Sequence, residues 1–237
     1  MTEQGIDRTA RLKTMWEGSS TEVSGALAQK RRLAAAMRRV IGRLVESDAP
    51  EDELSAAADG LERYAESLTK HPRLKRYEGF AETANAGDVG AFFDQSPLIG
   101  RANPLAPPIT LRATGERTAE GSVTFGSAYE GPPGCVHGGF VAAAFDEVLG
   151  FVHSLTGQPG FTGTLTVRYR KPTPLHTPLR FDGEVDRTER RKVFASGRLF
   201  AGETLCAEAE GIFISARPER FRALLEERAK REAERES

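Results

Sequence analysis

The sequence predicts an α+β fold in which an antiparallel sheet wraps around one central helix, with further helices at both ends of the chain. Three observations support this fold class. Small and apolar residues follow a cluster of glycines between residues 131 and 150, as in a helix that is buried on every side. Two segments of alternating apolar and polar residues precede this run, and four strand-like segments follow it. The turns that join these strands are short, which favours antiparallel neighbours.

An N-terminal extension, residues 1–80, is expected to contain two helices. Apolar residues recur at helical spacing between Val23 and Val45, among many Lys and Arg side chains. Asp48 followed by Glu51 is typical of a capping box, and a second apolar stripe runs from Leu54 to Leu68. Together these segments predict a helical hairpin that needs a surface to pack on.

Residues 81–108 form a connector rich in glycine and proline, and residues 109–216 form the core domain. The strands expected in the core domain are 109–113, 122–125, 161–169, 179–185, 193–200 and 205–214. Residues 217–237 are highly charged with a thin apolar stripe, which predicts a C-terminal helix.

The balance of charge does not point to a nucleic acid, a membrane surface or a polyanionic partner. The 237 residues include 33 Lys and Arg and 34 Asp and Glu, so the overall charge does not favour nucleic acid. The basic residues of the first helix are therefore interpreted as a solvated face. Two cysteines, Cys135 and Cys206, are too few for a disulfide framework and favour a reducing compartment. Without an apolar leader or an apolar run of membrane-spanning length, a cytoplasmic protein with no membrane span is expected.

The central run contains one acidic pair, Asp146 and Glu147. A buried carboxylate is unfavourable unless it is paired or used in chemistry. Neighbouring residues point to different faces of a helix, so only one of the two faces a given site. We assign the functional role to Asp146 and a structural role to Glu147, with a buried Asp that is only hydrogen-bonded as the alternative.

The order of elements, with His-Gly-Gly at the helix start and an acid nine residues after the His, resembles the hotdog fold. More narrowly, it resembles the PaaI-like and Them-type acyl-CoA thioesterases. The resemblance covers residues 95–216 and is carried by SPLIGRANPLAPP (96–108), GPPGCVHGG (131–139), Asp146, TGTLTVRYRKPTPL (162–175) and RRKVFASGRL (190–199). It implies hydrolysis of a fatty or aromatic acyl-CoA thioester, and no cofactor is expected because CoA is part of the substrate.

The resemblance also implies roles for individual residues. Asp146 matches the catalytic carboxylate, and Gly138 the residue whose backbone N–H polarises the thioester carbonyl. His137 helps to shape that turn, and Thr162 helps to hold the attacking water or the acid. Arg191 and Lys192 match residues that contact the CoA phosphates in Them-type members. Many members of the family carry Asn six residues before this His, where the present chain has Gly131.

These residues suit attack of water on a thioester. The N–H groups of Gly138 and Gly139, at a helix N-terminus, would donate to the developing oxyanion. Asp146 would act as general base or as nucleophile, and the sequence does not separate the two. As simpler alternatives, the glycines only form a tight turn, His137 only stabilises it, and each basic pair is an ordinary solvated turn. Lys171, at the end of a strand with Arg168 and Arg170, joins Arg191 and Lys192 as a candidate phosphate contact.

Helix length leads to a further expectation. Gly138 and Asp146 are eight residues apart on one helix, so at about 1.5 Å per residue they are separated by roughly 12 Å. One thioester does not reach both. If both serve one reaction, they come from different chains related by a two-fold axis, which predicts a homodimer with shared active sites and leaves open a tetramer.

Other chemistries lack support in the sequence. There is no GxSxG elbow for a Ser nucleophile, no phosphate-binding glycine motif, and no metal-ligand spacing among the four His and two Cys. Two other functions of the same fold remain open. One is a non-catalytic acyl-CoA binding protein, which does not need Asp146. The other is an enoyl-thioester hydratase, whose Asp is usually followed within a few residues by a His, whereas the next His here is His153.

Overall fold

The structure is a computed structural model that describes residues 25–72, 94–157, 160–215, 227 and 230–231. Two helices, α2 (Gly25–Leu44) and α3 (Glu51–Thr69), precede the core domain. The core domain contains β1 (Thr110–Ala113), β2 (Thr118–Val123), a 3₁₀ turn η1 (Ser127–Tyr129), the central helix α6 (Gly138–Ser154), β3 (Gly160–Tyr169), β4 (Leu179–Glu189), β5 (Lys192–Ala201) and β6 (Thr204–Ser215). Most of the predicted C-terminal helix, like residues 1–24 and 73–93, lies outside the described residues.

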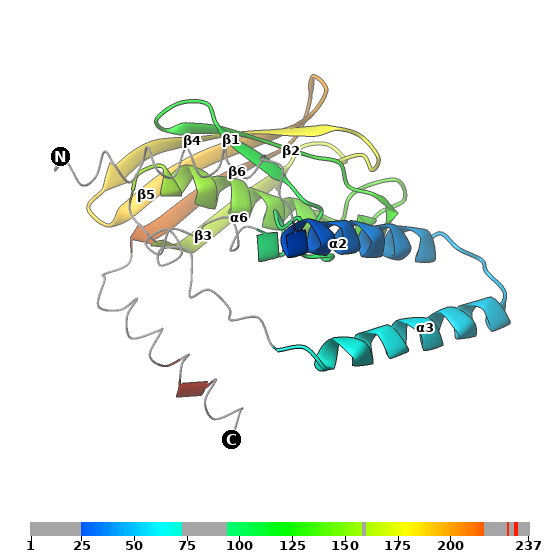
Figure 1. The fold of residues 1–237 in the computed structure, drawn as a ribbon. Coiled ribbons are helices and arrows are strands. Elements are labelled where there is room, and N and C mark those ends of the chain that lie inside the picture. The colour runs from blue at the N-terminus through cyan, green and yellow to red at the C-terminus, as the bar shows by residue number, and fades with distance from the viewer. Residues whose placement is uncertain (1–24, 73–93, 158–159, 216–226, 228–229, 232–237) are drawn as a thin grey trace.

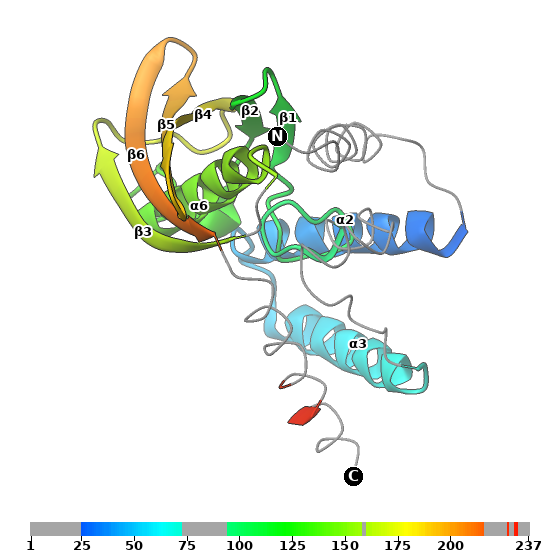
Figure 2. The same ribbon diagram turned by 90° about the vertical axis from the view of Figure 1, so that its left-hand side faces the viewer.

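The sheet has six strands in the order β1-β2-β4-β5-β6-β3, and every pair is antiparallel. It curves around α6, which lies on its concave side (Figures 1 and 2). The predicted fold of a sheet wrapped around one central helix is therefore confirmed. The consecutive strands β3 and β4 are not neighbours, although the linear order of strands suggested that they pair. Residues 170–178 carry the chain across the molecule, and β3 forms the edge of the sheet beside β6.

Glycines in the strands allow the sheet to approach α6 closely. A Cβ atom at Gly183 would lie 2.9 Å from Val152 Cγ2, and one at Gly197 would lie 3.1 Å from Leu149 Cδ2. Such contacts are shorter than van der Waals separation, so a side chain at either position would push the helix away. Glycines of the sheet therefore supply much of the close packing between the strands and α6.

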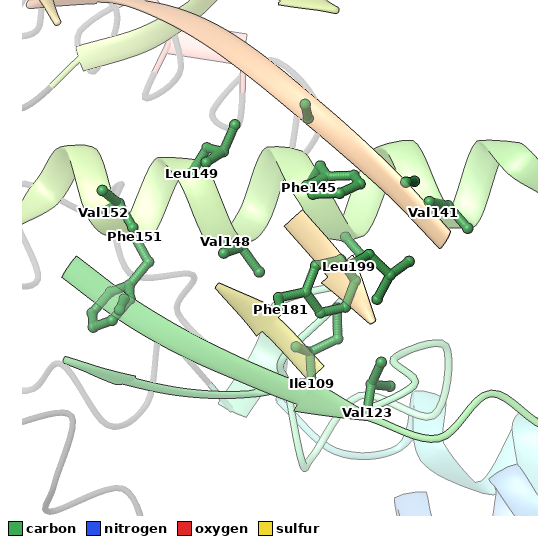
Figure 3. Packing of buried hydrophobic residues seen from close by; sticks show 14 of the residues in the cluster. Ile109, Val123, Val141, Phe145, Val148, Leu149, Phe151, Val152, Phe181 and Leu199 are labelled. Carbon is green, nitrogen blue, oxygen red and sulfur yellow. The ribbon is translucent and has the colours of Figure 1, made fainter. Parts of the chain in front are cut away.

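The core fills the space between α6 and the sheet. Phe145, Val148 and Leu149 of the helix pack with Phe181 and Leu199 of the strands, and all are buried (Figure 3). Phe145 and Phe181 meet edge to face, with ring centroids 5.2 Å apart. Burying a side chain of this size typically contributes about 1.5–3 kcal/mol, so this layer is the main source of stability in the core domain.

Two details differ from the sequence predictions. Asp48 and Glu51 do not form a capping box, because α3 begins after Pro50 and has no side-chain cap. Instead, three acidic residues in its first turn complement the positive end of the helix dipole. The strand β2 begins four residues before the predicted Ser122, which leaves a shorter turn after β1.

The two N-terminal helices are present as predicted, but they do not form a packed hairpin. They diverge in both views, and their apolar faces remain exposed (Figures 1 and 2). The helix α2 is attached to the connector, which packs on the core domain through Ile99, by a bidentate ion pair from Arg31 to Asp94. The two hydrogen bonds are 2.8 and 2.9 Å long, and both side chains are largely buried. Within the described part of the chain, no helix is both long and apolar enough to cross a membrane.

Candidate active site at the start of the central helix

The central helix begins at a turn that uses one of its two glycine amides. His137 is the N-cap of α6, and its Nδ1 accepts a hydrogen bond from the Gly139 N–H at 3.0 Å. An accepting Nδ1 places the proton of the neutral imidazole on Nε2. The Gly139 amide is therefore occupied, whereas the Gly138 N–H has no acceptor among the described residues. Of the two predicted oxyanion donors, only Gly138 is free.

Gly131 is held close to this turn. Its N–H donates to the Cys135 carbonyl at 2.9 Å, and a Cβ atom at residue 131 would lie 2.7 Å from His137 Cα. No side chain fits there without moving the backbone. The glycine that departs from the Asn of many relatives is thus built into the loop, and this position contributes no polar side chain to the site.

Tyr169, at the end of β3, supports the turn from the sheet. Its hydroxyl donates to the Gly138 carbonyl oxygen at 2.8 Å. A Cβ atom at residue 138 would lie 3.3–3.5 Å from the Tyr169 phenol, which is tight. Glycine at position 138 therefore suits the close approach of the tyrosine, and it also leaves the amide open to a ligand. The sequence analysis did not single out Tyr169, because a tyrosine in a strand is usually explained by packing alone.

A pocket of about 380 Å³ opens beside the free amide. Its walls come from the loop before α6, the first turns of α6 and the end of β3 and the loop that follows: Pro132, Cys135, Val136, Gly138, Val141, Tyr169, Arg170, Lys171, Pro172 and Thr173. Two cations therefore lie at the pocket, Arg170 and Lys171. Arg170 is paired with Glu208 at 2.7 Å, while no described acid pairs with Lys171.

Asp146 lies on a different part of α6 and is solvent-exposed in the single chain. The Thr162 hydroxyl donates to its Oδ1 at 2.7 Å, so the predicted partnership of these two residues is present in the structure. A bulge in β3 between Thr162 and Thr164 makes it possible. Side chains alternate along a strand, and the extra residue lets both Thr162 and Tyr169 face α6 despite their odd separation.

Glu147 has a different environment from its neighbour. It is largely buried, and this burial together with the charge of Asp146 raises its pKa from 4.5 to about 7. A buried carboxyl with no hydrogen-bond partner among the described residues favours its neutral form. The prediction that Asp146 and Glu147 serve different faces holds in the geometry: one carboxylate is exposed and hydrogen-bonded, and the other is desolvated.

The open flank of α6 corrects one expectation from the sequence. The helix was expected to be buried on every side, but Gly139 and Asp146 are exposed, and Ala142 and Ala143 are only half-buried. These residues share one flank of the helix, next to the edge strand β3. The helix is therefore as apolar as a fully buried one, while a single chain covers only part of it.

The second pair of predicted phosphate contacts lies at the opposite end of β3. Arg191 donates through Nε and Nη2 to the Ser215 carbonyl, at 3.0 and 2.9 Å, and so ties the β4–β5 hairpin to the end of β6. Ser215 in turn pairs with Gly160, the first residue of β3. Lys192 begins β5 and is exposed. Neither residue lies at the pocket beside Gly138 of its own chain.

Metal chemistry finds no support in this geometry. No cluster of three or more His, Cys, Asp or Glu side chains suited to a metal ion occurs in the part of the chain that the structure describes. His153 is buried and stacked on Phe213, with ring centroids 5.1 Å apart, and its Nε2 has no partner there. Burial lowers its pKa to about 4, so it is a neutral core residue.

Comparison with known proteins identifies the family of the chain. The profile of the thioesterase superfamily matches residues 133–208, which include the turn, α6 and most of the sheet. A solved structure, the thioesterase superfamily protein RHA08564, superposes with a TM-score of 0.71 at 31% identity, over 82% of this chain and 97% of that one. The chain belongs to the thioesterase superfamily. The resemblance found in the sequence is thereby confirmed at the level of the family.

Two curated relatives share the core domain of this superfamily member. The acyl-coenzyme A thioesterase THEM4 of Bos taurus is 36% identical over 97 residues, which are 40% of this chain and 40% of the relative. The acyl-coenzyme A thioesterase THEM5 of Homo sapiens is 34% identical over 91 residues, which are 38% and 37% of the two chains. The similar region thus spans about two fifths of these relatives.

Proposed function

We propose that this protein is an acyl-CoA thioesterase that hydrolyses a fatty or aromatic acyl-CoA to the free acid and CoA. The observation that carries the proposal is that α6 presents both an exposed, hydrogen-bonded Asp146 carboxylate and, at its N-terminus, a Gly138 amide without an acceptor among the described residues. The first is a base for water, and the second is a donor for an oxyanion. Similarity to two acyl-coenzyme A thioesterases gives the class of substrate.

The active form in this proposal is a homodimer joined along β3. This strand is one of the two edges of the sheet, the other being β1, and most of its residues are exposed. Exposed edges are pairing sites that monomeric proteins usually protect. Thr162 marks the end of β3 that lies at Asp146, and Tyr169 marks the end that lies at Gly138.

Antiparallel pairing of two β3 strands about a two-fold axis between Leu165 and Thr166 follows from these positions. It brings Thr162 and Asp146 of each copy next to Tyr169 and Gly138 of the other. The same pairing covers the open flank of α6. It also places the β4–β5 hairpin with Arg191 and Lys192 of one copy near Lys171 of the other, on one rim of the shared site. The predicted phosphate contacts, far apart in one chain, are then close together.

The reaction follows from these positions. Asp146 removes a proton from a water molecule as its oxygen attacks the thioester carbonyl carbon. Negative charge on the carbonyl oxygen is met by the Gly138 N–H of the other copy, at the positive end of its helix. The C–S bond then breaks, and the thiolate of CoA takes up a proton. In the alternative path the Asp146 carboxylate attacks the carbonyl carbon itself, and the C–S bond breaks to release the CoA thiolate, which takes up a proton. Water then hydrolyses the mixed anhydride, which releases the free acid and restores the Asp146 carboxylate.

The test compares Asp146→Asn with the matched neighbour variant Glu147→Gln across a panel of acyl-CoAs, by release of free thiol. Loss of a general base typically costs 10²–10⁴-fold, so kcat of Asp146→Asn is expected to fall by about that factor while Glu147→Gln remains active. Hydrolysis that persists in Asp146→Asn would contradict the proposal. Tight binding of acyl-CoA by the wild type without thiol release would favour a binding protein, and hydration of enoyl-CoA would favour a hydratase.

A further inference from the structure

Exposed apolar side chains concentrate on the two N-terminal helices. Of 13 large hydrophobic residues exposed among the described residues, ten lie on α2, on α3 or at the end of α2: Leu33, Met37, Val40, Ile41, Leu44, Val45, Leu54, Leu61, Tyr64 and Leu68. Monomeric proteins rarely leave such contiguous apolar surface in water, so these helices present an interaction surface. The active site proposed above does not use it.

The helix α2 has two different faces. One face, with Arg31, the buried Ala34 and Arg38, lies against the connector. There Arg31 pairs with Asp94, and Arg38 donates to the carbonyl of Asn103 at 2.8 Å. The other face carries the apolar residues and points away, with Met37 37% exposed and Leu44 57% exposed. A helix that is docked by one face and apolar on another has room for a second partner.

The helix α3 has an apolar stripe but no buried residue at all. Leu54, Leu61 and Leu68 recur every seven residues, and Tyr64 lies between them at the spacing of a coiled-coil seam. The exposed face of α2 has the same pattern, with Leu33 and Val40 at one seam position and Met37 and Leu44 at the other. Helices of about 20 residues are marginal alone in water, so α3 gains its stability from a partner helix.

Charge indicates which helix the partner is. The helix α2 carries six Lys and Arg and no acid, whereas α3 carries six Asp and Glu and one Arg. Two copies of α2, or two copies of α3, would repel each other, while α2 and α3 attract. The two helices of one chain diverge, with both seams exposed. A second copy of the chain supplies the missing complement.

We propose that two copies of this chain exchange N-terminal helices, so that the apolar face of α2 of each copy packs on α3 of the other. The position of α3 is compatible with this arrangement. In both views α3 lies below α2, lower than β3 and to one side of it (Figures 1 and 2). The free edge of β3 faces away from β6, toward the lower side of the molecule on which α3 lies. A copy that docks by β3 is therefore on the same side as α3. The inference itself does not depend on the proposed reaction.

The test is disulfide trapping between two copies of the chain, one of which carries a tag so that the two differ in length on a gel. In a background without native cysteines (Cys135→Ser, Cys206→Ser), a tagged chain with Met37→Cys is co-expressed with an untagged chain with Leu61→Cys and oxidised mildly. We expect a disulfide-linked pair of one long and one short chain. The control replaces Leu61→Cys with Ser55→Cys, an exposed residue outside the apolar stripe that lies about a third of a turn around α3 from Leu61. Its yield of mixed pairs is expected to be several-fold lower.

Three results would overturn the exchange. The first is no excess of mixed pairs over the Ser55→Cys control, and the second is linkage of Met37→Cys chains to one another. The third is a single chain carrying both Met37→Cys and Leu61→Cys that forms only an internal disulfide, which would show that α3 folds back on its own α2.

A second measurement does not depend on cysteines. The double variant Leu61→Gln/Leu68→Gln loses the apolar stripe of α3 and should show a weaker helical circular dichroism signal than its control, Ser55→Gln/Ala56→Gln. The control still packs α3 on a second copy, so its helical signal should fall on dilution, whereas the signal of the double variant should not change. Equal, concentration-independent signals would contradict the exchange.

Discussion

Two buried titratable groups on α6 predict opposite pH dependences of stability. The pKa of Glu147 is raised from 4.5 to about 7 by burial and then by the Asp146 charge. Its contribution to stability is full below pH 4.5 and is lost as the pH rises through 7. The pKa of His153 is lowered from 6.5 to about 4 by burial. Its contribution is full above pH 6.5 and is lost as the pH falls toward 4.

Each shift corresponds to about 3 kcal/mol, since a change of one in pKa is equivalent to about 1.4 kcal/mol. Between pH 4.5 and 6.5 the two effects oppose each other, so the wild type should change little in stability from these groups. Glu147→Gln removes one of them. It should therefore stabilise the protein by about 3 kcal/mol at pH 8 and by almost nothing at pH 4.5.

The assay is urea unfolding followed by circular dichroism at pH 4.5, 6 and 8, at one fixed protein concentration because the fold is expected to be oligomeric. The complementary variant His153→Phe keeps the stacking on Phe213 and removes the titration. His153→Phe should be more stable than the wild type at low pH and equally stable at pH 8. A Glu147→Gln gain of equal size at pH 4.5 and pH 8 would refute the reasoning, because it would show that the carboxyl is not desolvated.

Three further predictions concern contacts that position the site. Tyr169→Phe removes the hydroxyl that donates to the Gly138 carbonyl, and should lower kcat about tenfold with little change in KM or in mass by light scattering; an unchanged kcat would exclude the positioning role. Gly183→Ala places a methyl group 2.9 Å from Val152 Cγ2 and should destabilise the fold by about 1–3 kcal/mol in urea unfolding. In Gly202→Ala, by contrast, the added methyl group would meet no other atom, so this variant shows only the cost of a side chain at a positive φ. Asp94→Asn leaves Arg31 without its carboxylate and should release α2, seen as faster amide hydrogen exchange in residues 25–44 but not in α6; equal protection in α2 would contradict the anchoring.

Local chemistry fixed much of this protein in advance. The period of apolar residues placed α2, α3 and most of the strands close to their observed bounds, because helical and strand faces bury side chains with different spacing. The exceptions are β2, which begins four residues before the predicted start, and β4, which ends four residues after the predicted end. The glycines after His137 predicted the start of α6, and the spacing of Asp146 from that turn predicted two groups too far apart to act within one chain.

Contacts between distant segments were decided only in three dimensions. The bulge that turns Thr162 toward Asp146, the tyrosine under Gly138 and the hydrogen bond that occupies the Gly139 amide have no local signature. Nor does the pairing of β3 with β6 instead of β4, which leaves β3 as an open edge. Sequence patterns report which side of an element is apolar, but the partner that covers it is chosen by the free energy of packing the whole chain.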